Sequence, residues 1–227
     1  MPVLPSLRQA TPASWFDSEP AQLLYELEQQ RLLPQLASLP TQAWLWIAPS
    51  PRWLEGAALT GRGLRLHPEG DGYAGEARCA LPLPLPNESV YTIVLQHVTA
   101  SHAAQLLAEC ERVLMPGGRL FLSSLNPFSP YRTQWRRHGM VVRTPQRLRQ
   151  LIERVGLACG DTRYIGPMWP TGSTRSGSLV PLRAACLFSA EKRTFALPGP
   201  TPLKVRWAGP IATPGMTRSI LEPNEDH

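Results

Sequence analysis

The sequence predicts an α/β fold in which parallel strands alternate with helices. The evidence is clearest between residues 90 and 124. Residues 91–98 form a short apolar run rich in β-branched side chains, which is typical of a buried strand. A segment with helical apolar spacing follows, and residues 119–124 form a second apolar strand. This order predicts a βαβ unit with two parallel strands and a right-handed crossover.

The helix of this unit is expected to begin at Ser101, whose side chain can cap it. Gly117 and Gly118 are expected to end it, because glycine readily takes the left-handed conformation at a helix exit. The apolar residues between these ends recur on one helical face, which predicts the side that is buried against the sheet. They are Leu106, Leu107, Cys110, Val113 and Leu114.

Helix caps, prolines and apolar runs predict further helices and strands before and after this unit. Ser18 can cap a helix with Pro20 in its first turn, and Pro34 is expected to end or kink that helix. Thr144 can cap another helix, with Pro145 at its first position and Gly156 after its end. Further strands are expected at residues 43–48, 63–67, 77–80, 157–165 and 184–190.

Three motifs carry a family resemblance. The run from Glu109 through Arg112 to Gly118, Glu-x-x-Arg-Val-Leu-x-Pro-Gly-Gly, resembles a signature of class I S-adenosylmethionine-dependent methyltransferases. Residues 81–90 resemble the loop before the fourth strand of that family. Asn126 to Ser129, Asn-Pro-Phe-Ser, resembles a type 11-like subgroup of small bacterial methyltransferase-like proteins. The resemblance covers about residues 81–166.

This resemblance implies a Rossmann-like, doubly wound, mostly parallel seven-stranded sheet with helices on both faces. It also implies methyl transfer from S-adenosylmethionine to an acceptor that the sequence does not identify. By position, eight residues would line the cofactor crevice, and no catalytic residue is assigned. They are Ile47, Ala48, Pro49, His67, Cys79, Ala80, Gln96 and His97.

His97 is among the last residues of the predicted fourth strand. It therefore lies at the carboxyl end of that strand, which is the edge where open α/β sheets bind ligands. Its side chain is therefore either a polar group in the pocket or a structural histidine bonded to a neighbouring loop carbonyl. The sequence leaves both open.

The chain departs from the family where the cofactor binds. Residues 48–53 replace the glycine-rich loop after the first strand, and they contain two prolines, which lack amide donors, and no glycine. In the resembled family an acidic residue at the end of the second strand binds the ribose, and here His67 stands at that position. Glu69 and Asp71 follow it, and they are either within reach of a ribose or part of a solvated turn. Cys79 or Arg78 replaces the adenine-binding aspartate. The alternative function is therefore a catalytically inactive methyltransferase-fold protein that acts as a binding or regulatory subunit.

Charge points to an acidic partner, because the net charge is +6 and arginines are concentrated in one segment. Nucleic acid and an acidic protein both fit this charge. The segment has no nucleic-acid-binding motif. The arginines assigned to the partner surface are Arg132, Arg136, Arg137, Arg143, Arg147 and Arg149.

Composition also bounds location and domain organisation. The four cysteines lack metal-ligand spacing, which favours free, neutral thiols in a reducing cytoplasm and no metal site. No apolar run is long enough for a membrane span. The expected organisation is a flexible proline-rich leader at residues 1–18, a methyltransferase-like domain at 19–196 and a proline- and glycine-rich tail at 197–227.

Overall fold

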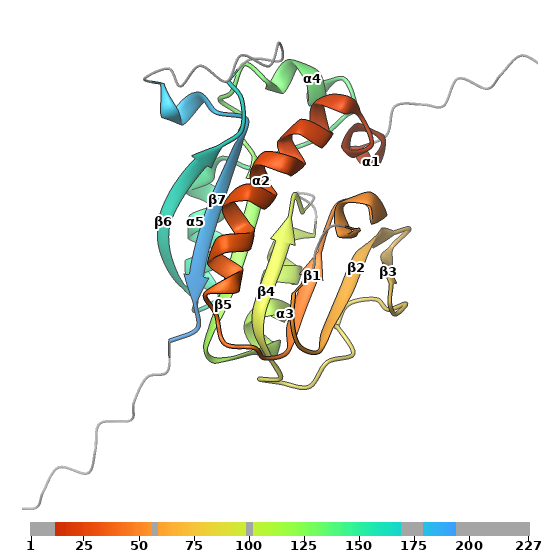
Figure 1. The fold of residues 1–227 in the computed structure, drawn as a ribbon, viewed down its shortest axis with the longest axis vertical. Coiled ribbons are helices and arrows are strands. Elements are labelled where there is room, and N and C mark those ends of the chain that lie inside the picture. The colour runs from red at the N-terminus through yellow and green to blue at the C-terminus, as the bar shows by residue number, and fades with distance from the viewer. Residues whose placement is uncertain (1–11, 56–58, 99–101, 169–178, 194–227) are drawn as a thin grey trace, which may run out of the picture. The chain divides into compact units, whose positions relative to one another are not determined.

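The computed structural model describes residues 12–55, 59–98, 102–168 and 179–193. These residues build a seven-stranded sheet in the order β3-β2-β1-β4-β5-β7-β6 (Figure 1). The four central strands are parallel, and β3, β7 and β6 are antiparallel to their neighbours. The strands are β1 (Trp44–Ile47), β2 (Gly63–Glu69), β3 (Gly72–Gly75), β4 (Val90–Gln96), β5 (Leu114–Leu125), β6 (Ala158–Ile165) and β7 (Ala185–Glu191).

Helices cover both faces of this sheet, which confirms the predicted doubly wound architecture. Figure 1 shows α2 crossing in front of the sheet and α3 and α5 behind it. One apolar core unites α1, α2 and α4 with the front of the sheet, and a second core unites α3 and α5 with the back. The α-helices are α1 (Pro12–Phe16), α2 (Glu19–Ala37), α3 (Ala103–Val113), α4 (Arg132–Arg136) and α5 (Pro145–Arg154), with short 3-10 helices η1 (Pro51–Leu54) and η2 (Val180–Leu182).

The predicted βαβ unit is formed by β4, α3 and β5. The apolar face of α3 is buried as expected, whereas Ser101, the predicted cap, lies outside the described residues. The prediction that Gly117 and Gly118 end the helix is wrong, because β5 already begins at Leu114. A Cβ at Gly118 would lie 2.8 Å from the carbonyl oxygens of Met115 and Tyr91, so this glycine permits a close approach of backbones inside the sheet.

The helix α2 continues through Pro34 to Ala37, so of the two predicted effects of this proline, ending the helix is wrong. A proline in a helix interior costs about 3 kcal/mol. Leu32 and Leu36, on either side of Pro34, are buried in the front core. This tertiary packing offsets the lost backbone hydrogen bond and holds the last turn in place.

The third strand is not where the pattern placed it. Residues 77–80 contribute only one bridge, from Cys79 to Tyr73, and β3 instead forms a hairpin with β2. Gly70 at the turn has a φ of +58°, and a Cβ at Gly72 would lie 2.6 Å from the carbonyl oxygen of Cys79. These glycines allow the reversal and the close passage of the next segment.

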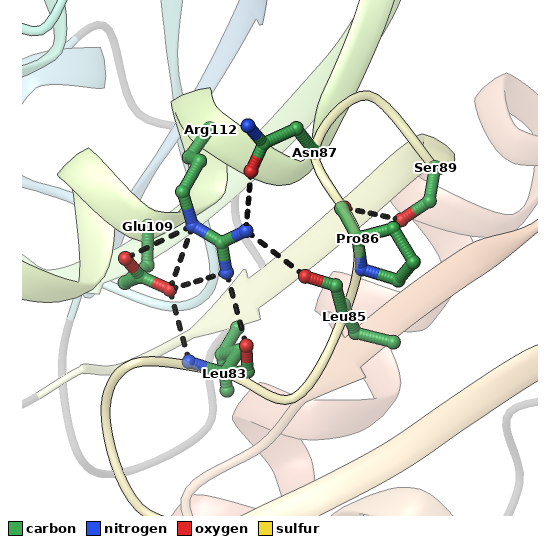
Figure 2. Close-up of polar contacts among 7 residues, drawn as sticks. All are labelled: Leu83, Leu85, Pro86, Asn87, Ser89, Glu109 and Arg112. Atoms are coloured by element: carbon green, nitrogen blue, oxygen red, sulfur yellow. Dashed lines mark hydrogen bonds and ion pairs between the residues drawn. The ribbon is translucent and has the colours of Figure 1, made fainter.

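No α-helix occurs between β1 and β4 in the described part of the chain, and an extended segment covers the sheet there. In residues 81–86, Leu83 is buried against the back core while the prolines between the leucines are exposed. Figure 2 shows that Arg112 holds this segment, donating to the carbonyls of Leu83 at 3.0 Å and Leu85 at 2.9 Å. Its guanidinium also pairs with Glu109 and lowers the pKa of that carboxyl. The Glu-x-x-Arg pair therefore clamps the segment that enters β4.

The ends of the chain are described only in part. Within the predicted leader, α1 buries Trp15 and Phe16 in the front core. The predicted tail lies outside the described residues. Among the residues that the structure describes, no helix has the length and apolarity to cross a membrane.

Candidate functional site

The carboxyl ends of β1 and β4 border a cavity of about 170 Å³. It lies between the loop after β1, the β2–β3 turn and the first turns of α3. Six of the eight residues assigned to the cofactor crevice line it, and their contact with a cofactor stays a prediction. They are Ile47, Ala48, Pro49, Ala80, Gln96 and His97.

The other two assigned residues do not line the cavity. His67 pairs with Ala74 in the β2–β3 hairpin. Cys79 is held by its backbone bridge to Tyr73. The structure thus leaves both side chains outside the space that the six residues share.

Of the two acidic residues at the end of β2 and in the turn after it, one lines the cavity and the other does not. Asp71 is exposed and lines the cavity. The carboxylate of Glu69 lies 3.2 Å from the guanidinium of Arg78, and both side chains are exposed. Of the two, only Asp71 borders the space where a ribose could lie.

An aromatic cluster packs around His97, which lines the cavity, and joins it to α1 and α2. We define it as Phe16, Tyr25, Trp53 and His97. The Trp53 ring is fully buried and lies 5.1 Å from the rings of Tyr25 and His97 and 5.4 Å from Phe16. Its indole N–H donates to the carbonyl of Phe16 at 3.0 Å. The loop after β1 therefore turns its largest side chain into the core.

A buried polar network lies behind this cluster and is centred on Glu28 of α2. The carboxylate of Glu28 accepts hydrogen bonds from Ser123 at 2.9 Å and Gln96 at 3.1 Å. Gln96 in turn accepts from the indole of Trp46 at 2.8 Å. Glu28 is fully buried. The network therefore joins α2 to the ends of β1, β4 and β5.

His97 belongs to this network and also lines the cavity. Its Nε2 lies 2.7 Å from Oε1 of Glu28, although the ring N–H is not aligned for a hydrogen bond, and its Nδ1 has no hydrogen-bond partner among the described residues. Its backbone has a φ of +49°, a strained conformation for a residue with a side chain. Its partner is a carboxylate on a distant helix, not the neighbouring loop carbonyl that was the alternative in the sequence.

Sequence reasoning missed Glu28, the residue on which the network depends. The available signal is its position on α2, because Leu24, Glu28 and Leu32 follow one another at intervals of four residues. A carboxylate in such an apolar row is expected to be buried, and a buried carboxylate needs partners.

The residues present do not fit a whole S-adenosylmethionine molecule. Pockets for ligands of this size are roughly 300–1,000 Å³, well above the volume of this cavity. Pro49 and Pro51 offer no amide donors, and the buried Trp53 packs against His97 of the cavity wall.

The six predicted arginines do not lie on one helix surface. Arg132, Arg136 and Arg137 are exposed at α4, which packs on the front of the sheet, whereas α5 packs on the back. Arg149 of α5 is already bound to Glu153 and to the carbonyl of Gly160, and Arg143 is half-buried. Arg147 is exposed on α5. An acidic partner on these residues stays a prediction.

The cysteines are free, and burial raises the pKa of all four thiols. Burial raises the pKa of Cys186 to about 12 and raises that of Cys110 further. It also raises the pKa of Cys79 and Cys159. This confirms the prediction of free, neutral thiols. No cluster of potential metal ligands occurs within the described ranges.

Solved structures of methyltransferases are similar to this chain over most of its length. A chain from the complex of the Haloferax volcanii Trm112 methyltransferase activator with a methyltransferase has a TM-score of 0.54 and 14% identity, over 82% of this chain and 100% of that one. An S-adenosylmethionine-dependent methyltransferase from Aquifex aeolicus has a TM-score of 0.52 and 11% identity, over 80% and 98%. One from Archaeoglobus fulgidus has a TM-score of 0.50 and 13% identity, over 78% and 96%.

No protein-family model matches the sequence, and no curated protein matches it significantly. Identities this low show the fold alone. The strand order, the parallel centre with its antiparallel edges, and these neighbours agree with one another. The chain therefore has the fold of the class I S-adenosylmethionine-dependent methyltransferases.

Proposed function

We propose that this chain is a binding protein built on the methyltransferase fold, and that it does not transfer methyl groups. The observation that carries this proposal is the aromatic cluster, in which Trp53 fills the space beside the loop after β1. Methyl transfer depends on holding the methyl sulfonium in line with its acceptor. A crevice with two prolines and a buried indole in place of open amides does not provide that hold.

The turn after β5 supplies a candidate docking surface for an acidic protein partner. Asn126 is fully buried and donates to the carbonyls of Pro181 at 2.7 Å and Arg183 at 2.8 Å, while its oxygen accepts from the backbone of Phe128 at 3.1 Å. These bonds make the turn rigid, yet the Phe128 side chain is 58% exposed. A rigid exposed aromatic residue is typical of an interface anchor.

The charge beside this anchor suggests the chemistry of the partner. Arg132, Arg136 and Arg137 follow Phe128 on and just after α4, and in the described part of the chain none of them forms an ion pair. An acidic segment with an apolar side chain would complement this surface. The Haloferax neighbour was solved in complex with an activator protein, which supports a protein partner on this fold.

A second candidate function is a methyltransferase that uses His97 as a general base. The observation in its favour is the contact of His97 with Glu28 at the wall of the crevice, because a carboxylate can orient an imidazole for proton transfer. This function requires the aromatic cluster to open when the cofactor binds.

Calorimetric titration with S-adenosylmethionine and S-adenosylhomocysteine separates the two functions. The binding-protein proposal expects no heat of binding at millimolar ligand from protein that is folded by circular dichroism. Micromolar binding, about −8 kcal/mol, would overturn it and favour the second function. A Trp53→Ala variant tests the cause, since removing the indole should create room and allow weak binding, whereas Arg52→Ala on the same 3-10 helix should bind like the wild type.

The docking surface has its own test. A partner captured by cross-linking in cells should be lost when Phe128→Ser is combined with Arg136→Glu, and retained with Arg154→Glu, which changes an exposed arginine on α5. Equal capture by both variants would exclude this surface as the docking site.

A further inference from the structure

A second and larger cavity lies on the front of the sheet near its β6 edge. Its volume is about 380 Å³, and it is bordered by the second half of α2, by β6 and β7, and by the η2 turn. It shares no lining residue with the cavity at the ends of β1 and β4. Its volume falls in the range of roughly 300–1,000 Å³ for small-ligand pockets.

Three elements each contribute an arginine to this cavity: Arg31 from α2, Arg163 from β6 and Arg183 from the end of η2. None of the described residues that line it carries a carboxylate. Arg31 and Arg163 are exposed, and within the described part of the chain neither forms an ion pair. Two guanidinium groups without a counter-charge, those of Arg31 and Arg163, favour an anionic ligand.

The walls of this cavity are held by the core beneath them. Arg163 pairs in register with Leu187 of β7, whose side chain is buried and lines the floor. The carbonyl of Arg183 accepts a hydrogen bond from buried Asn126 at 2.8 Å. The amide of Gln35 donates to the carbonyl of Arg31 at 2.7 Å. The backbones that carry the arginines are therefore fixed before any ligand binds.

We propose that this cavity binds a small molecule that carries a phosphate or diphosphate group. A guanidinium presents several N–H donors in one plane and matches phosphate oxygens in a bidentate geometry. Three arginines suit a multiply charged anion better than a single carboxylate. Val180 and Leu187 offer an apolar wall for the uncharged part of the ligand. This site does not depend on the crevice at the ends of β1 and β4.

The test is calorimetric titration with inorganic pyrophosphate at low ionic strength. We expect saturable binding to one site that weakens as sodium chloride is added, because the contacts are between charges. Arg31→Gln and Arg163→Gln should each weaken it by about tenfold or more, since each removes charge-assisted hydrogen bonds. Both side chains are exposed, so these variants should stay folded, which thermal unfolding checks.

The matched control is Arg154→Gln, which removes an exposed arginine of α5 that does not line the cavity. It should bind pyrophosphate like the wild type. Equal weakening by Arg154→Gln and Arg163→Gln would show that only net charge matters and would overturn the proposal. So would the absence of saturable binding at millimolar pyrophosphate. Neither result bears on the binding of S-adenosylmethionine.

Discussion

Replacing Glu28 by alanine tests whether the buried network holds α2 on the sheet. The substitution removes the acceptor of the hydrogen bonds from Ser123 and Gln96 and leaves the ring of His97 without its carboxylate. Because Glu28 is fully buried, water does not replace these contacts unless the protein opens.

The expected loss follows from the groups left unpaired. A buried polar group without its partner costs about 1–3 kcal/mol, and Glu28→Ala leaves the donors of Ser123 and Gln96 without their acceptor. The contributions of members of one network are not additive, so we expect Glu28→Ala to lower the free energy of unfolding by about 2–5 kcal/mol. Such a loss is a large fraction of the roughly 5–15 kcal/mol that stabilises a typical domain.

Urea unfolding followed by tryptophan fluorescence measures this change, since Trp46 and Trp53 lie beside the network. Glu28→Gln keeps an acceptor oxygen and should lose less than Glu28→Ala. Glu26→Ala, at an exposed position of the same helix, should stay within about 0.5 kcal/mol of the wild type. A Glu28→Ala variant within 1 kcal/mol of the wild type, about the cost of one ordinary hydrogen bond, would refute the reasoning.

Three further predictions follow from other contacts. Arg112 lowers the pKa of Glu109 in the folded protein, so Glu109→Gln should lower stability to urea at neutral pH, and the difference from wild type should shrink as pH falls below 4.5, where the wild-type carboxyl takes up its proton. Gly118→Ala should lower the free energy of unfolding by about 1–3 kcal/mol, because its Cβ would collide with two backbone carbonyls. Cys110 and Cys186 should not react with a disulfide reagent at mildly alkaline pH until the protein unfolds, because burial raises the pKa of both thiols.

Each of these predictions has a result that contradicts it. A pH-independent difference for Glu109→Gln would mean that its ionised form is no more stable in the folded protein than in the unfolded one. If Gly118→Ala has the same free energy of unfolding as the wild type, β5 shifts to make room for the added methyl group. Rapid reaction of Cys110 in urea-free solution would mean that α3 leaves the sheet more readily than its burial indicates.

The secondary structure from β4 to α5 was partly readable because its periodicities are strong. The apolar row of α3 predicts its buried face correctly, although not its end. The cap and proline of α5 predict its start, and Thr144 does accept from the backbone of Arg147. Local rules were less successful where packing competes with them. Pro34 lies inside a helix because buried leucines hold both sides of it, and the third strand moved to a hairpin because Gly70 and Gly72 permit the reversal.

Most of the assigned crevice residues share one cavity because the ends of parallel strands meet at one edge of the sheet. His67 and Cys79 lie outside that cavity, because the β2–β3 hairpin takes the place of the strand that was expected at residues 77–80. The contact between Glu28 and His97 could not be predicted, since it joins residues far apart in the chain whose helices and strands meet only after folding.

The sequence alone determined the α/β class, the order of most elements and the absence of a glycine-rich loop after the first strand, because these depend on residues close together in the chain. The tertiary structure decided what fills the place of that loop, which arginines share a surface and where the chain leaves a cavity lined by Arg31 and Arg163. The physical reason is that burial and charge clustering are properties of the packed chain. A side chain's neighbours come from several elements, and no local pattern records which of them will meet.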